Sequence, residues 1–283
     1  MTSDKSLHEI EHEAWSQRAE IYDSVFGSIS KQAIGDILDS LGKIEGKKHL
    51  DVACGTGHLV AAASLRGAAS EGIDFAEPMI EVARKTYPGN LFKVADATQL
   101  PYEHCSFGAV TCAFGLSHVE KAQVAVDEVF RILKPGGRFA FTLWFDGENG
   151  NELFRITNDA VTRFAIEVFA LPEIWKRMRF ADEQICESVI RQSGFDTPHF
   201  KRLPILWQTT SAGQILDILE KISVRSKMVI GHQSPAIQQQ ILEYILSEID
   251  DRRVDGNIKL TWPALLTVVQ KPGRKGKDYE PRT

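Results

Sequence analysis

Three aspartates in the first third of the chain have the spacing and setting of a ligand-binding site. Asp51 lies in the apolar run LDVACGTGHL, Asp74 ends the run EGID, and Asp96 ends the run LFKVAD, each one strand and one helix further along. In open α/β sheets, ligands bind beyond the carboxyl ends of the strands. Ionised carboxylates accept hydrogen bonds from hydroxyl, amine and ammonium groups. We therefore expect the three acids along one rim of a sheet, around a ligand that carries such donors.

The loop Gly55-Thr-Gly57 indicates which ligand this is. A glycine loop lets a ligand lie against bare backbone, and the start of the helix behind it offers free N–H groups. The loop is not the GxGxxG of dinucleotide-binding folds, because Ala53 takes the place of the first glycine and His58 follows Gly57. It is not the phosphate-binding GxxxxGK[ST] either. A ligand with a ribose and an adenine but no phosphate fits better.

Each acid then has a matching group on such a ligand. Asp51, close to the loop, suits an ammonium group. Asp74 is placed to accept from a ribose diol, as the corresponding acid does in dinucleotide-binding folds. Asp96, with Ala97 beside it, suits the exocyclic amine of the adenine.

From Lys48 onward, short apolar strands alternate with amphipathic helices, which predicts a parallel sheet with helices on both faces and right-handed crossovers. Lys134-Pro-Gly-Gly137 is expected to form a tight turn into the fifth strand. The predicted strands are 49–54, 69–75, 91–96, 107–114 and 138–144, and the predicted helices are 59–65, 77–87 and 121–133.

The segments on either side of this alternation are predicted to be mainly helical. Ser6 and Glu9 fit a capping box at the start of a helix over residues 7 to 26, with the stripe Trp15, Ala19, Tyr22 and Phe26 on one face, and a second helix follows. Residues 146–193 look helical and are expected to form part of a cap. A strand over 199–207, helices over 212–228 and 234–250, and a last strand that begins after Pro263 complete the chain.

The bulk properties exclude several classes of protein. The 283 residues are 43% hydrophobic and 25% charged, with a formal net charge of -5, so we expect a globular protein without a basic face for nucleic acid. No apolar run is long enough to span a membrane, and the N-terminus lacks a signal-peptide pattern, which predicts a cytoplasmic protein. The cysteines form no CxxC pair, so we expect buried, reduced thiols and no metal site; these are Cys54, Cys105, Cys112 and Cys186.

The chain resembles the class I S-adenosylmethionine-dependent methyltransferases, especially the ubiquinone/menaquinone-type enzymes. The resemblance rests on LDVACGTGHL, EGIDFAEPMI, ADATQLPY, SFGAVTCAFGLSHV and RILKPGGRFAFTLW, which follow the arm WSQRAEIYD in the family's order over residues 12–145. It implies a Rossmann-like, seven-stranded, mostly parallel α/β sheet, with an N-terminal helical arm or lid (1–45), a cofactor-binding core (46–145) and a remainder with helical cap insertions (146–283). Ala53 replaces a glycine of many members, and Gly108 replaces a common aspartate, which puts the local packing of the fourth strand in question.

The family pattern assigns the cofactor S-adenosylmethionine to named positions. Its methionine portion would lie by the first strand and loop, its ribose on the second strand, its adenine between the second and third strands, and its sulfonium near the fourth. The implied cofactor-binding residues are Tyr22, Asp51, Ala53, Gly55, Gly57, Asp74, Phe75, Met79, Asp96, Ala97 and Phe114.

The resemblance implies methyl transfer to a small-molecule acceptor. This reaction needs alignment in a dry pocket, and a base only where the acceptor must lose a proton. His118, just after the fourth strand, is the candidate base, although it could equally order its loop; His12 is a weaker candidate. Trp15 and Tyr22 could form a lid or core, and Trp15, Trp144 and Trp207 are predicted to bind the acceptor, for which large aromatic side chains favour a flat or apolar molecule.

Two other functions stay open. A relative could bind S-adenosylmethionine and use its charge to assist a cyclisation or rearrangement without methylating anything, since the binding motifs would be the same. A non-catalytic partner of another enzyme is a third possibility, and a homodimer is possible in each case.

Overall fold

Seven strands form one sheet in the order β3-β2-β1-β4-β5-β10-β6 in the computed structural model, which describes residues 6–145, 150–167 and 181–273. β10 is antiparallel to β5 and β6, and the pairs among β1 to β5 are parallel, which confirms the predicted, mostly parallel α/β sheet. The strands are β1 Lys48–Val52, β2 Ala69–Asp74, β3 Leu91–Val94, β4 Phe107–Ala113, β5 Leu133–Trp144, β6 His199–Leu203 and β10 Ala264–Gln270.

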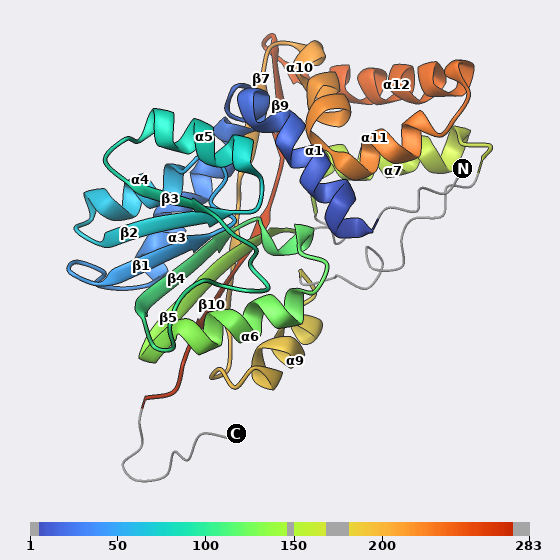
Figure 1. Cartoon of the computed structure of the whole chain (residues 1–283). Coiled ribbons are helices and arrows are strands. Elements are labelled where there is room, and N and C mark those ends of the chain that lie inside the picture. The colour runs from blue at the N-terminus through green and yellow to red at the C-terminus, as the bar shows by residue number, and fades with distance from the viewer. Residues whose placement is uncertain (1–5, 146–149, 168–180, 274–283) are drawn as a thin grey trace.

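Helices cover both faces of this sheet (Figure 1). Side chains alternate along β5, so that Phe139 and Phe141 contribute to the core beneath one set of helices and Ala140 to the core beneath the other. Phe139 and Phe141 lie beneath α6 Ala122–Ile132 and α9 Glu183–Gln192, and Ala140 lies on the opposite face, which is covered by α3 Ile34–Ser40, α4 His58–Leu65 and α5 Glu77–Thr86.

The turn predicted at 134–137 lies inside β5 instead. Leu133 already pairs with Phe107, and the pairing register then shifts before Ala109 meets Arg138. A side chain at Gly137 would come within 2.8 Å of the Lys134 carbonyl oxygen, so the irregularity needs glycine there. Gly108 lies at the same shift, and a side chain there would first meet the side chain of Lys47, at 3.2 Å.

The N-terminal arm begins with α1 Leu7–Tyr22, and the predicted capping box between Ser6 and Glu9 is present. The helix continues as a π-helical turn, Asp23–Gly27, which confirms the predicted extent of about twenty residues. α1 contacts α5, and it crosses above the carboxyl ends of the central strands (Figure 1).

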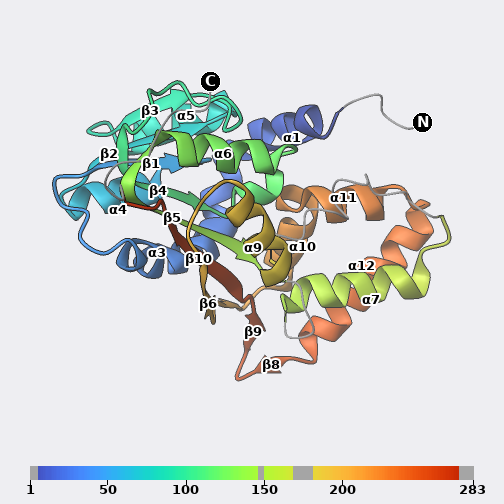
Figure 2. The ribbon, with the colours of Figure 1, turned by 90° about the horizontal axis from the view of Figure 1, so that it is seen from below.

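A second group of helices extends from that end of the sheet, as seen from below in Figure 2. It contains α7 Glu152–Phe164, α10 Ala212–Asp217, α11 Val224–Gly231 and α12 Pro235–Asp250, and its apolar residues join the core on the α3 face. α9, which we assigned to the cap, contacts α6 on the sheet instead. The helix predicted over 212–228 is interrupted, because Ser223 is extended and caps α11.

The prediction of a single strand over residues 199–207 is wrong. β6 ends at Leu203, and β7 Leu206–Thr209 belongs to a separate antiparallel sheet with β9 Asn257–Thr261 and β8 Arg253–Val254. Pro204 lies between β6 and β7, and proline has no N–H to continue the ladder. The last strand begins at Ala264, as predicted.

Among the described residues, no helix has the length and apolarity needed to cross a membrane. All four cysteines are free; Cys54, Cys112 and Cys186 are buried, as predicted, whereas Cys105 is exposed.

Candidate active site

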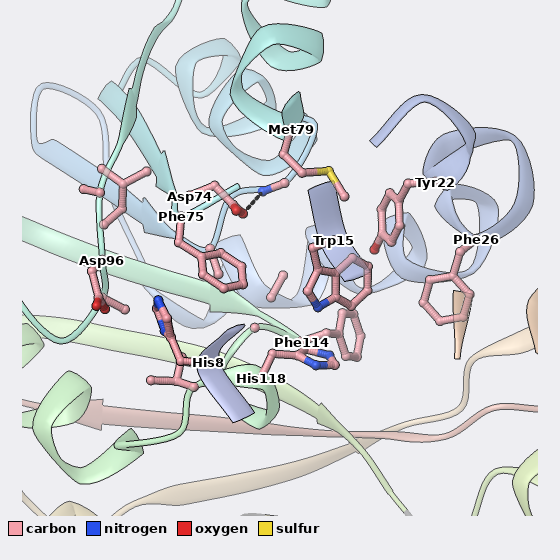
Figure 3. A pocket seen from close by; sticks show the side chains of 18 of the residues that line it. His8, Trp15, Tyr22, Phe26, Asp74, Phe75, Met79, Asp96, Phe114 and His118 are labelled. Atoms are coloured by element: carbon pink, nitrogen blue, oxygen red, sulfur yellow. Dashed lines mark hydrogen bonds between the residues drawn. The ribbon is translucent and has the colours of Figure 1, made fainter. Parts of the chain in front are cut away.

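A pocket lies at the carboxyl ends of β1 to β4, beneath α1 (Figure 3). The space between its walls is about 850 Å³ when the open mouth is included. Asp96 and His8 lie toward one end in Figure 3, Tyr22 and Phe26 toward the other, and Trp15 lies between. The two ends of the pocket therefore differ: one has polar side chains and the other has aromatic rings.

The loop after β1 forms one wall with its bare backbone. Ala53, Gly55 and Gly57 all have positive φ, at 55°, 50° and 89°, and Gly57 leads directly into α4. A side chain at Gly55 would meet no protein atom within 4 Å, so the space beside it belongs to the pocket. At Gly57 a side chain would strike the ring of Phe92 at 2.7 Å, so this glycine is required by packing.

Asp74 ends β2 at the centre of the site, and the dashed line in Figure 3 marks one of its hydrogen bonds. Its Oδ2 accepts from the Gly55 N–H at 2.9 Å and its Oδ1 from the Ala76 N–H at 3.0 Å. Burial raises the pKa of Asp74, while the N–H groups of Ala76 and Gly55 and the charge of His118 oppose that rise. Each carboxylate oxygen keeps a further lone pair for a ligand hydroxyl.

One end of the pocket lies at the carboxyl ends of β2 and β3. Phe75, Asp96 and Ala97 line this part, and Met79 lies nearer to Trp15 and Tyr22 (Figure 3). Asp96 is exposed, and its Oδ1 accepts from the Thr98 N–H at 2.8 Å. His8 of the arm packs edge-on against Phe75 with ring centroids 5.6 Å apart, so that the arm closes this end.

Asp51 lies elsewhere, inside the sheet. It is 1% exposed and its Oδ1 accepts from the Thr111 hydroxyl at 2.7 Å, while Thr111 is itself 3.0 Å from His49 Nε2. Burial, with the charge of Asp74, raises the pKa of Asp51 to about 7 in spite of the Thr111 hydrogen bond. Asp51 does not line the pocket.

The opposite end of the pocket is aromatic. Phe114, with φ 62°, stacks on Trp144 with ring centroids 3.8 Å apart, and Trp144 meets Phe26 edge-on at 5.4 Å. Gly115 faces the Ala53 side chain so closely that no Cβ fits between them. These residues form a flat, apolar wall beside the glycine loop.

His118 lies where the arm meets this aromatic end. Its Nδ1 is 3.0 Å from Oε2 of Glu11, an arm residue whose side chain is 2% exposed. Trp15 Nε1 donates to the same Oε2 at 3.0 Å, and the Trp15 and His118 rings meet edge-on at 4.9 Å. A buried carboxylate therefore contacts the candidate base at its Nδ1 atom.

A second polar contact fastens the arm to the glycine loop. Asp23 Oδ1 accepts from the Thr56 hydroxyl at 3.0 Å and lies 2.6 Å from His58 Nε2, while His58 Nδ1 lies 2.5 Å from the Tyr87 hydroxyl. Burial would raise the pKa of Asp23, but the hydrogen bonds and the charge of His58 outweigh it and lower that pKa.

The structure brings most of the predicted site residues to one pocket. Those that line it are Trp15, Tyr22, Ala53, Gly55, Asp74, Phe75, Met79, Asp96, Ala97, Phe114, His118 and Trp144. Asp51 and Gly57 lie behind the wall, and Trp207 is 5% exposed in the apolar core, 5.9 Å from Trp262. His12 meets Phe75 edge-on and does not line the pocket.

Sequence reasoning missed several lining residues, notably His8, Phe26, Gly115 and Val119, and missed Glu11 behind His118. His8 and Glu11 lie on the arm helix that was predicted, and an acid on the same face as Trp15 was a usable signal. Gly115 follows Phe114 directly, so it could have been inferred from the strand end.

Comparisons with known proteins agree with this geometry. A family described as "Methyltransferase domain" matches residues 50–141. The demethylmenaquinone methyltransferase of Clavibacter sepedonicus is 43% identical over 102 residues, 35% of this chain and 42% of that protein. The enzyme of the same name from Staphylococcus aureus (strain MRSA252) is 37% identical over 147 residues, 48% of this chain and 61% of that protein. The chain therefore spans about half the length of these relatives.

The chain thus matches a methyltransferase domain over residues 50–141. Its fold recurs in phosphoethanolamine N-methyltransferase 2 of Haemonchus contortus, solved with S-adenosyl-L-methionine, at a TM-score of 0.59 and 18% identity over 95% of this chain and 61% of that one. At this identity the likeness shows the fold. The cofactor bound in that solved structure is S-adenosyl-L-methionine.

The residues of the methyltransferase domain fit that cofactor. The open space at Gly55 would admit a group against bare backbone, and the free lone pairs of Asp74 match a ribose diol. Phe75 and Met79 supply the apolar surface that an adenine needs, and Asp96 supplies an acceptor for its amine.

Proposed function

We propose that the chain transfers the methyl group of S-adenosylmethionine to a small, flat or apolar acceptor. The observation that carries this proposal is the continuity of one pocket, which joins the Asp74 carboxylate to the aromatic end formed by Phe114 and Trp144. We infer that the arm (1–45) covers the cofactor held by the core (46–145), and that the helical insertions of 146–283 contribute to acceptor binding.

When bound, the cofactor supplies a methyl group already activated by its sulfonium charge. The protein's contribution is then to align the acceptor with that methyl group and to keep water out, which can account for much of a methyl transfer's acceleration. Phe114 and Trp144 orient a flat acceptor by stacking and apolar contact. Trp15, Tyr22 and Phe26 of the arm close the pocket against water.

His118 serves an acceptor that must lose a proton. Nδ1 is engaged by Glu11, which leaves Nε2 to take the acceptor's proton and hold it while the new bond to the methyl group forms. Histidine suits this step because its ordinary pKa lies near neutral pH. An acceptor that already presents an unprotonated nucleophile would not need it.

The test is a mass-shift assay with trideuteromethyl-labelled S-adenosylmethionine. A demethylmenaquinol is the first acceptor to try, because the relatives' name points to it, followed by other hydroxylated or quinone-like aromatics. The proposal predicts a product heavier by one trideuteromethyl group in place of hydrogen, and an equal amount of S-adenosylhomocysteine. A product that changes structure without gaining the label, with the cofactor intact, would contradict methyl transfer and favour the cyclisation alternative.

A further inference from the structure

Glu11 is a buried acid that the cofactor and acceptor sites do not account for. Its side chain is 2% exposed on the inner face of α1, where Leu7, Ala14, Arg18 and Ala19 are also buried. A carboxylate is costly to bury without partners. Its Oε2 has two, the Trp15 indole and the His118 imidazole, and His118 comes from a loop 107 residues away in the sequence.

The two contacts fix where the imidazole proton lies. An indole N–H can only donate, so Oε2 of Glu11 is an acceptor in its bond to Trp15. An ionised carboxylate can only accept, so His118 Nδ1, 3.0 Å from the same oxygen, donates its N–H in a second hydrogen bond. A neutral His118 therefore carries its proton on Nδ1 and its lone pair on Nε2.

That assignment leaves the proton-accepting nitrogen available. His118 lines the pocket, and its Nε2 has no hydrogen-bond partner within the described part of the chain. If Nε2 takes a proton, the resulting positive charge lies beside Glu11 and also interacts with Asp74. Arg18 also interacts with Glu11, from further along α1.

The arrangement also couples the base to the arm. Glu11 lies on α1, whereas His118 follows β4, so the imidazole is held in this orientation only when α1 covers the pocket. Trp15 joins the two, because its ring meets His118 edge-on while its N–H reaches Glu11. Closure of the site and orientation of the base would then be one event.

We propose that Glu11 is a positioning residue, which holds His118 as the Nδ1–H tautomer with Nε2 directed to the acceptor. This proposal rests on the proposed function for its chemical consequence but not for its structural test.

The test is ¹⁵N NMR of the histidine side chains in full-length protein with S-adenosylhomocysteine added, with His118→Gln used to assign the signal. We expect the Nδ1–H tautomer in the wild type and its loss in Glu11→Ala. Glu20→Ala, an exposed acid on the same helix, is the matched control and should leave the signal unchanged. Trp15→Phe removes the indole donor but not the carboxylate, so it should also keep the Nδ1–H signal.

Glu11→Gln distinguishes the orientation of His118 from the effect of the Glu11 charge, and it is the variant to use if Glu11→Ala does not fold. Its amide oxygen can still accept from Nδ1, so the tautomer should persist, whereas turnover should fall at least tenfold because the imidazolium loses its counter-charge. An Nε2–H tautomer in the wild type, or an Nδ1–H signal that survives in Glu11→Ala, would overturn the proposal. If no acceptor is methylated, the NMR result still decides the role of Glu11 independently of the proposed function.

Discussion

Replacing Gly55 by alanine should weaken cofactor binding much more than it weakens the fold. Gly55 has a φ of 50°, and a Cβ built there meets no protein atom within 4 Å. The added methyl group would therefore enter the pocket rather than the core. A left-handed alanine costs about 1–2 kcal/mol of strain, whether or not a ligand is present.

Gly46 offers a matched control. It has a φ of 70°, it also has open space at the Cβ position, and it lies in an exposed loop outside the pocket. Gly46→Ala should therefore show the same backbone strain and a melting temperature lowered by a few degrees, without any effect on the ligand.

The difference in ligand Kd between Gly55→Ala and Gly46→Ala measures the free-energy cost of placing a methyl group in the site. Forcing one methyl group into a filled site costs about 1–3 kcal/mol, which corresponds to a Kd for S-adenosylhomocysteine raised by roughly 5- to 150-fold in Gly55→Ala. Isothermal titration calorimetry measures the Kd, and thermal unfolding measures the strain. Wild-type affinity in Gly55→Ala, with both variants equally destabilised, would refute the placement of the cofactor against this loop.

Three further substitutions test other parts of the site. Asp74→Asn should weaken the binding of S-adenosylhomocysteine by about 1.5–3 kcal/mol, because charge-assisted hydrogen bonds are lost. An unchanged Kd in calorimetry would mean that the ribose binds elsewhere. His118→Ala should lower kcat about a hundredfold with the cofactor Kd unchanged, whereas full turnover would leave His118 with a structural role only. Asp51→Asn tests the buried carboxylate. Burial raises the pKa of Asp51 to about 7 from an ordinary 3.8, so the folded protein holds this proton more tightly than the unfolded chain does. As the pH rises from about 4 to about 7, the wild type should therefore lose up to about 4 kcal/mol of stability relative to the variant. Unfolding at several pH values measures this, and a difference between the two proteins that does not change with pH would contradict it.

The sheet and the cofactor rim could be predicted because both depend on local pattern. Strand and helix periods are visible within ten residues, and a strand's last residue marks the rim, so Asp74 and Asp96 were found from sequence alone. Asp51 has the same pattern but lies within β1 instead of after it, where its side chain meets Thr111.

The parts that were missed depend on contacts between distant segments, or on signals that were overlooked. Nothing local to Glu11 or His118 reveals that they meet across 107 residues. The small sheet did have a signal, since Asp255-Gly256 is a typical two-residue hairpin turn and Ile258 and Leu260 alternate with exposed residues. Trp207 faces the core for a related reason, because β7 pairs with β9 there.

The most direct test of the account is calorimetric titration of the purified protein with S-adenosylmethionine and, separately, with S-adenosylhomocysteine. We expect both to bind at one site with a micromolar Kd, which Gly55→Ala raises and Gly46→Ala leaves unchanged. Absence of binding by either ligand, or binding that is insensitive to Gly55→Ala, would contradict the claim that the pocket between Asp74 and the aromatic wall is the cofactor site.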